Sequence, residues 1–255
     1  METTNYNKLL NNLDELKLSA LKDNLSFYTS LASKGEKSFI EALYELTEKE
    51  KTFRRERLMN NSVKTAGFPY LKKYDDYDFS FQPSLKKEEI ADLMSLRFID
   101  NKENIIFVGS PGTGKTHLAT SIGIEAALHR YGVRFVTCQR LLSDFTQAIE
   151  ENRLEKKMKQ YSGYKILIID EIGYMNMDTA QANLFFQLIS RRYERKSTIL
   201  TTNKTLNKWS DIFKDPVITN AILDRLLHHC HIVNIIGPSY RTKDIISSLE
   251  DKQPA

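Results

Sequence analysis

Cysteine is scarce in this chain of 255 residues, which contains only Cys138 and Cys230. Two cysteines are too few for a disulfide framework, so we expect the protein to work in a reducing compartment. No stretch approaches the roughly 18 consecutive apolar residues of a membrane-spanning helix, and the N-terminal residues contain no apolar signal core. The sequence therefore predicts a cytoplasmic protein with no membrane partner.

Glycine and proline are also few, with ten and six residues, which leaves little room for long disordered tracts. Hydrophobic residues make up 41% of the chain, enough for a substantial core. Neither an internal repeat nor a low-complexity segment is present. The length allows one large domain or two small ones.

The most informative stretch is GSPGTGKTHLA, residues 109–119, which contains the complete pattern G-x-x-x-x-G-K-[ST]. It follows the apolar run NIIFV and leads into a helix-like segment, the strand–loop–helix order that a phosphate-binding loop requires. Backbone N–H groups of such a loop converge on phosphate oxygens at the positive end of the helix. Lys115 is expected to reach the β- and γ-phosphates, and the Thr116 hydroxyl to bind Mg²⁺. The predicted nucleotide contacts are Gly109, Ser110, Pro111, Gly112, Thr113, Gly114, Lys115, Thr116 and His117.

Three regions of different pattern follow one another along the chain. Apolar residues at helical spacing predict a small all-α domain over residues 1–65. Residues 66–103 read as an aromatic connector that packs on the next domain, followed by an amphipathic helix. Over residues 104–255, five apolar strands alternate with helices, which predicts an α/β domain whose five-stranded parallel sheet is covered on both faces.

Two carboxylates end the apolar strand ILIIDE, at the edge of the sheet where α/β proteins build their sites. We expect Asp170 to hold the Mg²⁺ shell and Glu171 to polarise an attacking water. Acidic residues also end strands without any catalytic role, but here they follow a complete phosphate-binding loop. The second acid favours hydrolysis over phosphoryl transfer to a small molecule.

Two further polar residues follow later strands and helices. Asn203 ends TILTTN and is a candidate for contact with the γ-phosphate or the water, although asparagine also favours turns. Arg225, in AILDRLLHHC, lies too late in the chain to reach its own phosphate loop easily. It is a candidate arginine finger for the nucleotide of a neighbouring subunit, or else a surface ion-pair partner of Asp224. The run HHCH, residues 228–231, lacks the ligand spacing of zinc sites and reads as the approach to the fifth strand.

Positive charge is concentrated between residues 51 and 73, although the formal net charge is only +4. This run contains seven basic residues and one acid, so it is a candidate surface for nucleic acid. An ordinary solvated helix face followed by a linker would look similar. The predicted DNA contacts are Arg54, Arg55, Arg57, Lys64, Lys72 and Lys73.

The order of the phosphate loop, LIIDE, TTN and DR resembles that of AAA+ ATPases of the DnaA/DnaC branch. Within this branch the chain resembles most the IstB-like helper ATPases of bacterial insertion sequences. The resemblance runs almost from end to end. Its discriminating phrases are DFSFQPSL at residues 78–85 and TTNKTLNKW at residues 201–209, joined by SYR at residues 239–241.

This resemblance implies an ATPase that uses ATP and Mg²⁺, forms a homo-oligomer on double-stranded DNA and deforms it, and delivers that site to a cognate transposase. It also implies an AAA+ core behind a helical N-terminal domain that contacts DNA or the partner, and it places Arg241 where such proteins have a second sensor arginine. DnaC-like relatives instead load a replicative helicase, which is the alternative function. A P-loop kinase for a small molecule is disfavoured, because it would leave Glu171 and Arg225 without a role.

Overall fold

The computed structural model describes residues 2–242, and the chain separates into two compact units, Met1–Asn61 and Ser62–Ala255. The first unit consists of the helices α1 (Glu2–Glu15) and α2 (Ser19–Ser33) and the first part of α3 (Phe39–Ala66). Its small core is formed by Leu13, Leu25, Tyr28, Ala42 and Leu46. Among the described residues 2–61 there is no strand, as the leucine spacing predicts.

A buried carboxylate joins the helices of this first unit. Glu50, on α3, accepts hydrogen bonds from the backbone N–H of Leu21 and from the Nε of Arg54, both at 3.0 Å. The same guanidinium donates to the carbonyl of Lys17 at 3.2 Å. Arg54 therefore fastens α3 to the turn between α1 and α2, and it compensates the charge of a side chain that is only 6% exposed.

The second unit is built on a five-stranded sheet, and all of its strand pairings are parallel. The strand order is β2-β3-β4-β1-β5, and β1, β3 and β4 are almost entirely buried because helices cover both faces. This arrangement confirms the predicted α/β class. The strands are β1 (Asn104–Gly109), β2 (Val133–Thr137), β3 (Ile166–Ile172), β4 (Ser197–Thr202) and β5 (Cys230–Ile235).

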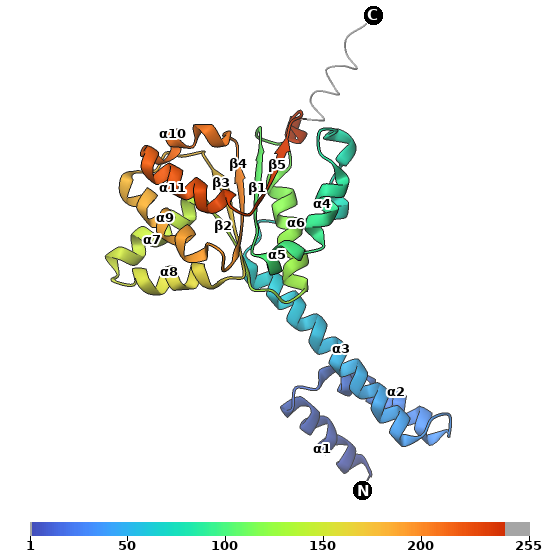
Figure 1. Ribbon diagram of the computed structural model, residues 1–255. Helices are drawn as coiled ribbons and strands as arrows, with labels where there is room; N and C mark the ends of the chain where they lie inside the picture. The colour runs from blue at the N-terminus through green and yellow to red at the C-terminus, as the bar shows by residue number, and fades with distance from the viewer. Residues whose placement is uncertain (1, 243–255) are drawn as a thin grey trace, which may run out of the picture. The chain divides into compact units, whose positions relative to one another are not determined.

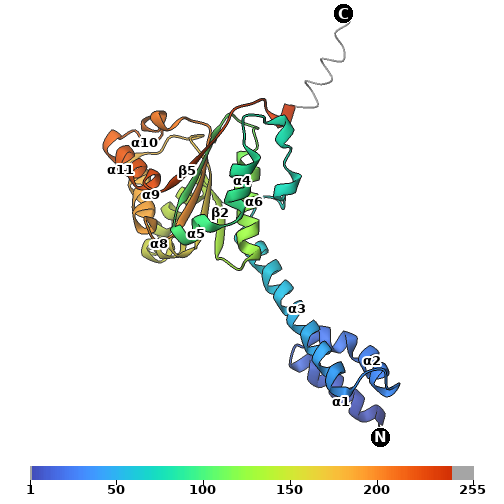
Figure 2. The ribbon, with the colours of Figure 1, turned by 45° about the vertical axis from the view of Figure 1, so that its right-hand side comes forward.

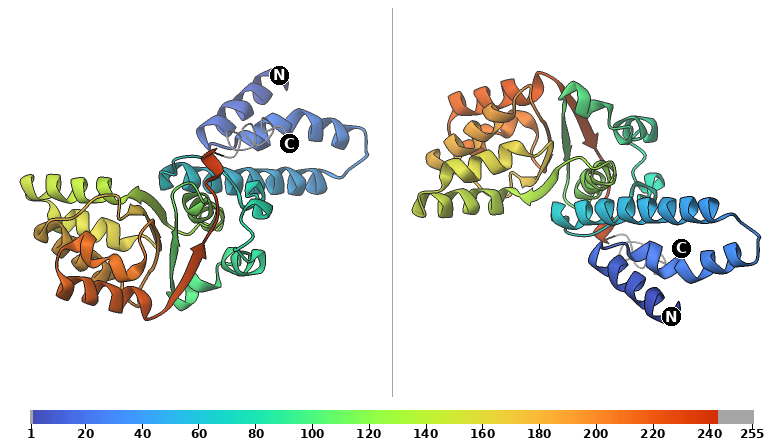
Figure 3. Two further views of the ribbon diagram at one scale, coloured as in Figure 1. Left: turned by 90° about the horizontal axis from the view of Figure 1, so that it is seen from above. Right: turned by 90° about the horizontal axis from the view of Figure 1, so that it is seen from below.

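Helices cover the two faces of this sheet as separate layers, which are visible from above and below in Figure 3. Each layer packs its own hydrophobic cluster against the strands, and Figure 1 shows the two groups on either side of the sheet. The first layer contains α7 (Cys138–Glu150), α8 (Leu154–Gly163), α9 (Thr179–Arg192), α10 (Ser210–Phe213) and α11 (Pro216–Leu227). The second contains α4 (Lys87–Met94), α5 (Arg97–Asn101) and α6 (Lys115–Leu128).

The amphipathic segment before the sheet forms two short helices, α4 and α5, instead of one. Leu96 lies between them with a φ of 65°, a left-handed conformation that ends a helix. Burial of Leu96, Phe98 and Ile99 in the core accounts for this break, because one continuous helix could not direct all three inward. None of the helices within the described residues is long and apolar enough to cross a membrane.

The aromatic connector packs on the second unit, as predicted, and runs beside α6 in Figure 2. It contains two 3-10 turns, η1 (Tyr74–Asp76) and η2 (Phe79–Phe81). The Asp78 carboxylate caps η2 by accepting from the backbone N–H groups of Ser80 and Phe81. Tyr74, Tyr77 and Phe79 are half-buried against the hydrophobic cluster around α6.

Candidate nucleotide-binding site

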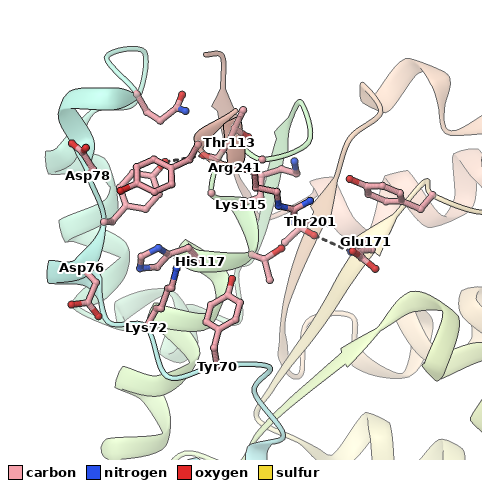
Figure 4. A pocket seen from close by; sticks show the side chains of 17 residues that line it. Tyr70, Lys72, Asp76, Asp78, Thr113, Lys115, His117, Glu171, Thr201 and Arg241 are labelled. Carbon is pink, nitrogen blue, oxygen red and sulfur yellow. Dashed lines mark hydrogen bonds between the residues drawn. The ribbon is translucent and has the colours of Figure 1, made fainter. Parts of the chain in front are cut away.

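A cavity of about 260 Å³ lies at the carboxyl ends of the strands, above the start of α6 (Figure 4). Segments that are far apart in the sequence line it: the connector, the loop between β1 and α6, the carboxyl ends of β3 and β4, and the residues that follow β5. This is the place where parallel α/β sheets bind ligands. The resemblance phrases DFSFQPSL and SYR therefore meet the phosphate loop at a single pocket.

Two glycines of the loop have geometric reasons to be glycine. Gly112 and Gly114 have φ values of 80° and 91°, which residues with a side chain rarely adopt. A Cβ atom at Gly112 would lie 1.9 Å from the Ser239 Oγ, and one at Gly114 would lie 2.5 Å from the Tyr77 ring. The loop is therefore held tightly between the connector and the segment after β5.

Lys115 begins α6, and its ammonium group is turned into the loop. Its Nζ donates hydrogen bonds to the carbonyls of Gly109 and Ser110, both at 2.7 Å. The side chain is buried, and this burial lowers the pKa of Lys115 to about 8. The group is thus an incompletely compensated cation at the place where phosphate is expected.

A pair of oxygen ligands lies at the foot of the cavity. The Thr116 hydroxyl donates to the Asp170 carboxylate at 2.9 Å, and Asp170 is buried. Burial raises the pKa of Asp170, against the hydrogen bonds from Thr201 and Thr116 that lower it. A hydroxyl beside a carboxylate is a ligand set that suits Mg²⁺, so these residues fit the predicted metal site.

Glu171 follows Asp170 but is exposed, and its side chain lines the cavity (Figure 4). Its backbone N–H donates to the Thr201 hydroxyl at 3.0 Å, and Thr201 in turn donates to the Asp170 carboxylate. Sequence reasoning missed Thr201 as a site residue, because threonine is common in β-strands and Asn203 was the polar residue singled out in the phrase TTN. Only the pairing of β3 with β4 brings it to these carboxylates.

The connector is bonded directly to the phosphate loop and to α6. The Tyr77 hydroxyl donates to the Thr113 carbonyl at 3.0 Å, and burial raises the pKa of Tyr77 to about 12, so the phenol stays protonated. The His117 Nε2 donates to the Lys73 carbonyl at 2.8 Å, while the Lys72 side chain lines the cavity. His117 therefore lies at the pocket, beside the connector. The Lys72 side chain, predicted as a DNA contact, lines this cavity and is also exposed.

The segment after β5 covers the other side of the loop. The Tyr240 backbone N–H donates to the Gly112 carbonyl at 2.9 Å, and the neighbouring Arg241 side chain lines the cavity. The Gln82 side chain joins this segment to the connector by donating to the Pro238 carbonyl at 2.9 Å. Arg241 is thus brought to the same cavity as the phosphate loop.

Asn203 and Arg225 are not brought to this cavity. The Asn203 amide oxygen is buried close to Gly173 and has no hydrogen-bond partner within residues 2–242. The Arg225 guanidinium lies over the Phe186 ring, 4.8 Å from its centroid, and donates to the Ala221 carbonyl at 2.9 Å. The alternative ion pair with Asp224 is not formed among the described residues.

The predicted DNA contacts Arg55, Arg57 and Lys64 are exposed, and so is the Lys73 side chain. The HHCH run leads into β5, as expected, because β5 begins at Cys230. His228 and His229 nevertheless lie together with Glu194 on the surface, with ligand atoms within 4.8 Å of one another. His228 already pairs with the Tyr193 hydroxyl at 2.8 Å.

Proteins similar in sequence to this chain are described as ATP-binding, in agreement with the geometry of the cavity. The model of the family described as IstB-like ATP binding protein matches residues 11–248. A protein of Bacillus thuringiensis subsp. berliner, named for ATP binding in insertion sequence IS232, is 48% identical over 246 residues, 96% of this chain and 98% of that relative.

Solved structures share the fold. AMPPCP-bound DnaA from Aquifex aeolicus matches 72% of this chain and 56% of its own, with a TM-score of 0.57 and 19% identity. The DnaC helicase loader matches 68% of this chain and 98% of its own, with a TM-score of 0.51 and 23% identity. The second unit therefore has the AAA+ fold of the DnaA/DnaC type.

Proposed function

Because this chain belongs to the IstB-like ATP-binding family, whose matched relative is an insertion-sequence protein, we propose that this ATPase is a helper of transposition. In this role it assembles with ATP on double-stranded DNA and presents the target site to its cognate transposase. The observation that carries the proposal is the match to an insertion-sequence protein over nearly the full length of both chains. That match includes the helical unit, which lies outside the ATPase fold.

The site residues divide the ATPase reaction among themselves. Loop N–H groups and Lys115 bind the phosphates, and Thr116 with Asp170 holds Mg²⁺. Mg²⁺ held there would neutralise part of the charge on the phosphate oxygens. Glu171 is exposed in the cavity and forms no ion pair among the described residues. Its carboxylate accepts the proton of the attacking water.

Arg225 and Asn203 complete this assignment. Arg225 lies away from the cavity of its own chain, which supports a role at the nucleotide of a neighbouring subunit. Asn203 follows β4, two residues after Thr201, and its buried amide oxygen has no partner within residues 2–242, which supports a role in accepting a hydrogen bond from the attacking water. Arg241 contributes a further cation to the phosphates.

Helicase loading is the alternative function, and it has one specific observation in its favour. The match to the solved structure of the DnaC helicase loader extends over 98% of the length of that chain. Its identity is only 23%, however, whereas the insertion-sequence relative is 48% identical. The greater similarity favours the transposition helper.

The proposal is tested by sedimentation of the full chain with fluorescent duplex DNA, with either ATP and Mg²⁺ or ADP and Mg²⁺. The Glu171→Gln variant is included to hold the ATP-bound state. We expect a large DNA-bound species with ATP and only small species with ADP, and we expect that large species to retain the cognate transposase. Equal assembly with both nucleotides would contradict the proposal. Retention of the host's replicative helicase in place of the transposase would favour the alternative.

A further inference from the structure

The two site carboxylates lie on an irregular part of β3. Ile169 pairs with Leu200 of β4, and the next paired residues are Ile172 and Thr202. Two residues of β3, Asp170 and Glu171, therefore oppose the single residue Thr201. This two-against-one count is a β-bulge, and Glu171 adopts the left-handed φ of 64° within it.

The bulge explains how two consecutive residues serve one cavity. Successive side chains of a regular strand point to opposite faces of the sheet, so an even strand would separate the two carboxylates. Here Asp170 accepts from Thr116, which lines the cavity, and Glu171 lines the same cavity. The left-handed backbone conformation of Glu171 costs free energy, so the surrounding structure must hold this residue in place.

Thr201 supplies that restraint through one hydroxyl group. Its Oγ1 accepts the Glu171 backbone N–H at 3.0 Å, the contact drawn in Figure 4, and donates its own proton to the Asp170 carboxylate. The side chain is 1% exposed. Because a hydroxyl has a single proton to donate, the hydrogen bond to Asp170 leaves Thr201 no proton to donate to a bound ligand.

We propose that Thr201 is a positioning residue for ATP hydrolysis, which fixes the Glu171 carboxylate relative to Asp170. This inference rests on the proposed role of Glu171 as the group that activates water. Removing the hydroxyl leaves the Glu171 N–H without its partner and lets the bulge relax, so the carboxylate loses its fixed position in the cavity. A serine retains both hydrogen bonds, whereas a valine retains only the shape.

The test compares Thr201→Val and Thr201→Ser in the full chain, with thermal unfolding and ADP binding as checks on folding. For Thr201→Val we expect kcat to fall by about 10- to 100-fold, with KM for ATP within about threefold of the wild type. Thr201→Ser should retain kcat within about threefold. A normal kcat in the valine variant, or an equal loss in the serine variant, would overturn the inference.

Two further measurements identify the carboxylate through which Thr201 acts. In a Glu171→Gln background, Thr201→Val should reduce the residual single-turnover rate by less than about threefold, because residues that act together are not additive. The Mg²⁺ concentration for half-maximal activity should stay within about threefold of the wild type. A full additional loss, or recovery of kcat at high Mg²⁺, would instead place the effect on Asp170 and refute the inference. Normal hydrolysis by Glu171→Gln alone would refute the proposed function itself, which distinguishes the two failures.

Discussion

Lys115 combines a buried ammonium group with a loop whose geometry suits phosphate. In the free protein, burial lowers the pKa of Lys115 to about 8, and Asp170 offsets only part of this effect. Bound phosphates favour the charged lysine and so raise its pKa above the value of the free protein. Binding of ATP is therefore linked to protonation of this residue.

The expected consequence is that ATP affinity falls as the pH rises. Below the pKa of the free protein the lysine is already charged, and above it each binding event must also take up a proton. Between about pH 7 and about pH 9, we predict a loss of affinity of about tenfold, measured by titration calorimetry with ATP and Mg²⁺. Circular dichroism at each pH controls for unfolding. An affinity that stays constant over this range would contradict the linkage between ATP binding and protonation of Lys115.

Asp170 titrates in the opposite sense. Burial raises the pKa of its carboxyl group in the free protein, whereas a bound cation favours the ionised form. Magnesium binding should therefore weaken as the pH falls toward that raised pKa. Nucleotide and Mg²⁺ binding should therefore weaken both above the pKa of Lys115 and below the raised pKa of Asp170.

At the scale of the elements, α3 contains four of the six basic residues predicted to contact DNA, and the structure gives its arginines different environments. Arg54 is bonded to the buried Glu50 and to the turn after α1, while Arg55 and Arg57 are exposed. Replacing Arg54 would leave a buried carboxylate without its cation, so its loss is expected to lower the stability of the helical unit. DNA contact is better tested with the other two arginines.

We predict that the double variant Arg55→Glu, Arg57→Glu binds duplex DNA more weakly and with a flatter salt dependence. Each phosphate contact contributes about −0.9 to the slope of log affinity against log salt, so two lost contacts should reduce it by about 1.8. Fluorescence anisotropy at several salt concentrations measures the slope. The matched control is Lys8→Glu, Lys49→Glu, which makes the same charge change at two exposed lysines outside the basic run. Equal slopes in the two variants would mean that Arg55 and Arg57 only form a solvated helix face.

The regular elements were predictable from the sequence, because hydrophobic periodicity and the glycine loop are local signals. The five apolar strands, the helices between them and the all-helical start are found where those signals place them. The connector has no period, and contacts distant in sequence, such as that of Tyr77 with Thr113, determine its path. The bulge at Glu171 and its partner Thr201 leave no trace in the apolar phrase ILIIDE, because they depend on the register between two strands. Sequence reasoning therefore predicted Asp170 and Glu171 but not Thr201, which is hydrogen-bonded to both.

At the scale of the whole molecule, an ATPase fold is joined to a helical unit by α3, which contributes residues to both. The ATPase unit holds a complete phosphate loop and both carboxylates, but Arg225 does not line its cavity. A second chain that supplied this arginine would place each ATP at a boundary between subunits. Loss of the γ-phosphate on hydrolysis would then remove a charged contact from that boundary, so assembly would follow the nucleotide state.

Assembly would also govern the binding of DNA. Individual phosphate contacts of exposed arginines are weak, and they add up only when subunits are linked on the same duplex. The central claim is therefore that Arg225 acts on the ATP of a neighbouring chain. Arg225→Ala should bind ATP nearly as well as the wild type, but it should not hydrolyse ATP or form the ATP-dependent oligomer.

The most direct test mixes the Arg225→Ala chain with a Lys115→Ala chain, each of which is inactive alone, and measures ATP hydrolysis. Co-sedimentation of differently labelled chains on duplex DNA shows that the two variants assemble together. A mixed boundary can pair the intact phosphate loop of the Arg225→Ala chain with the intact arginine of the Lys115→Ala chain. We predict that the mixture recovers part of the wild-type ATPase activity. Absence of any recovery in a mixture shown to co-assemble would contradict the account.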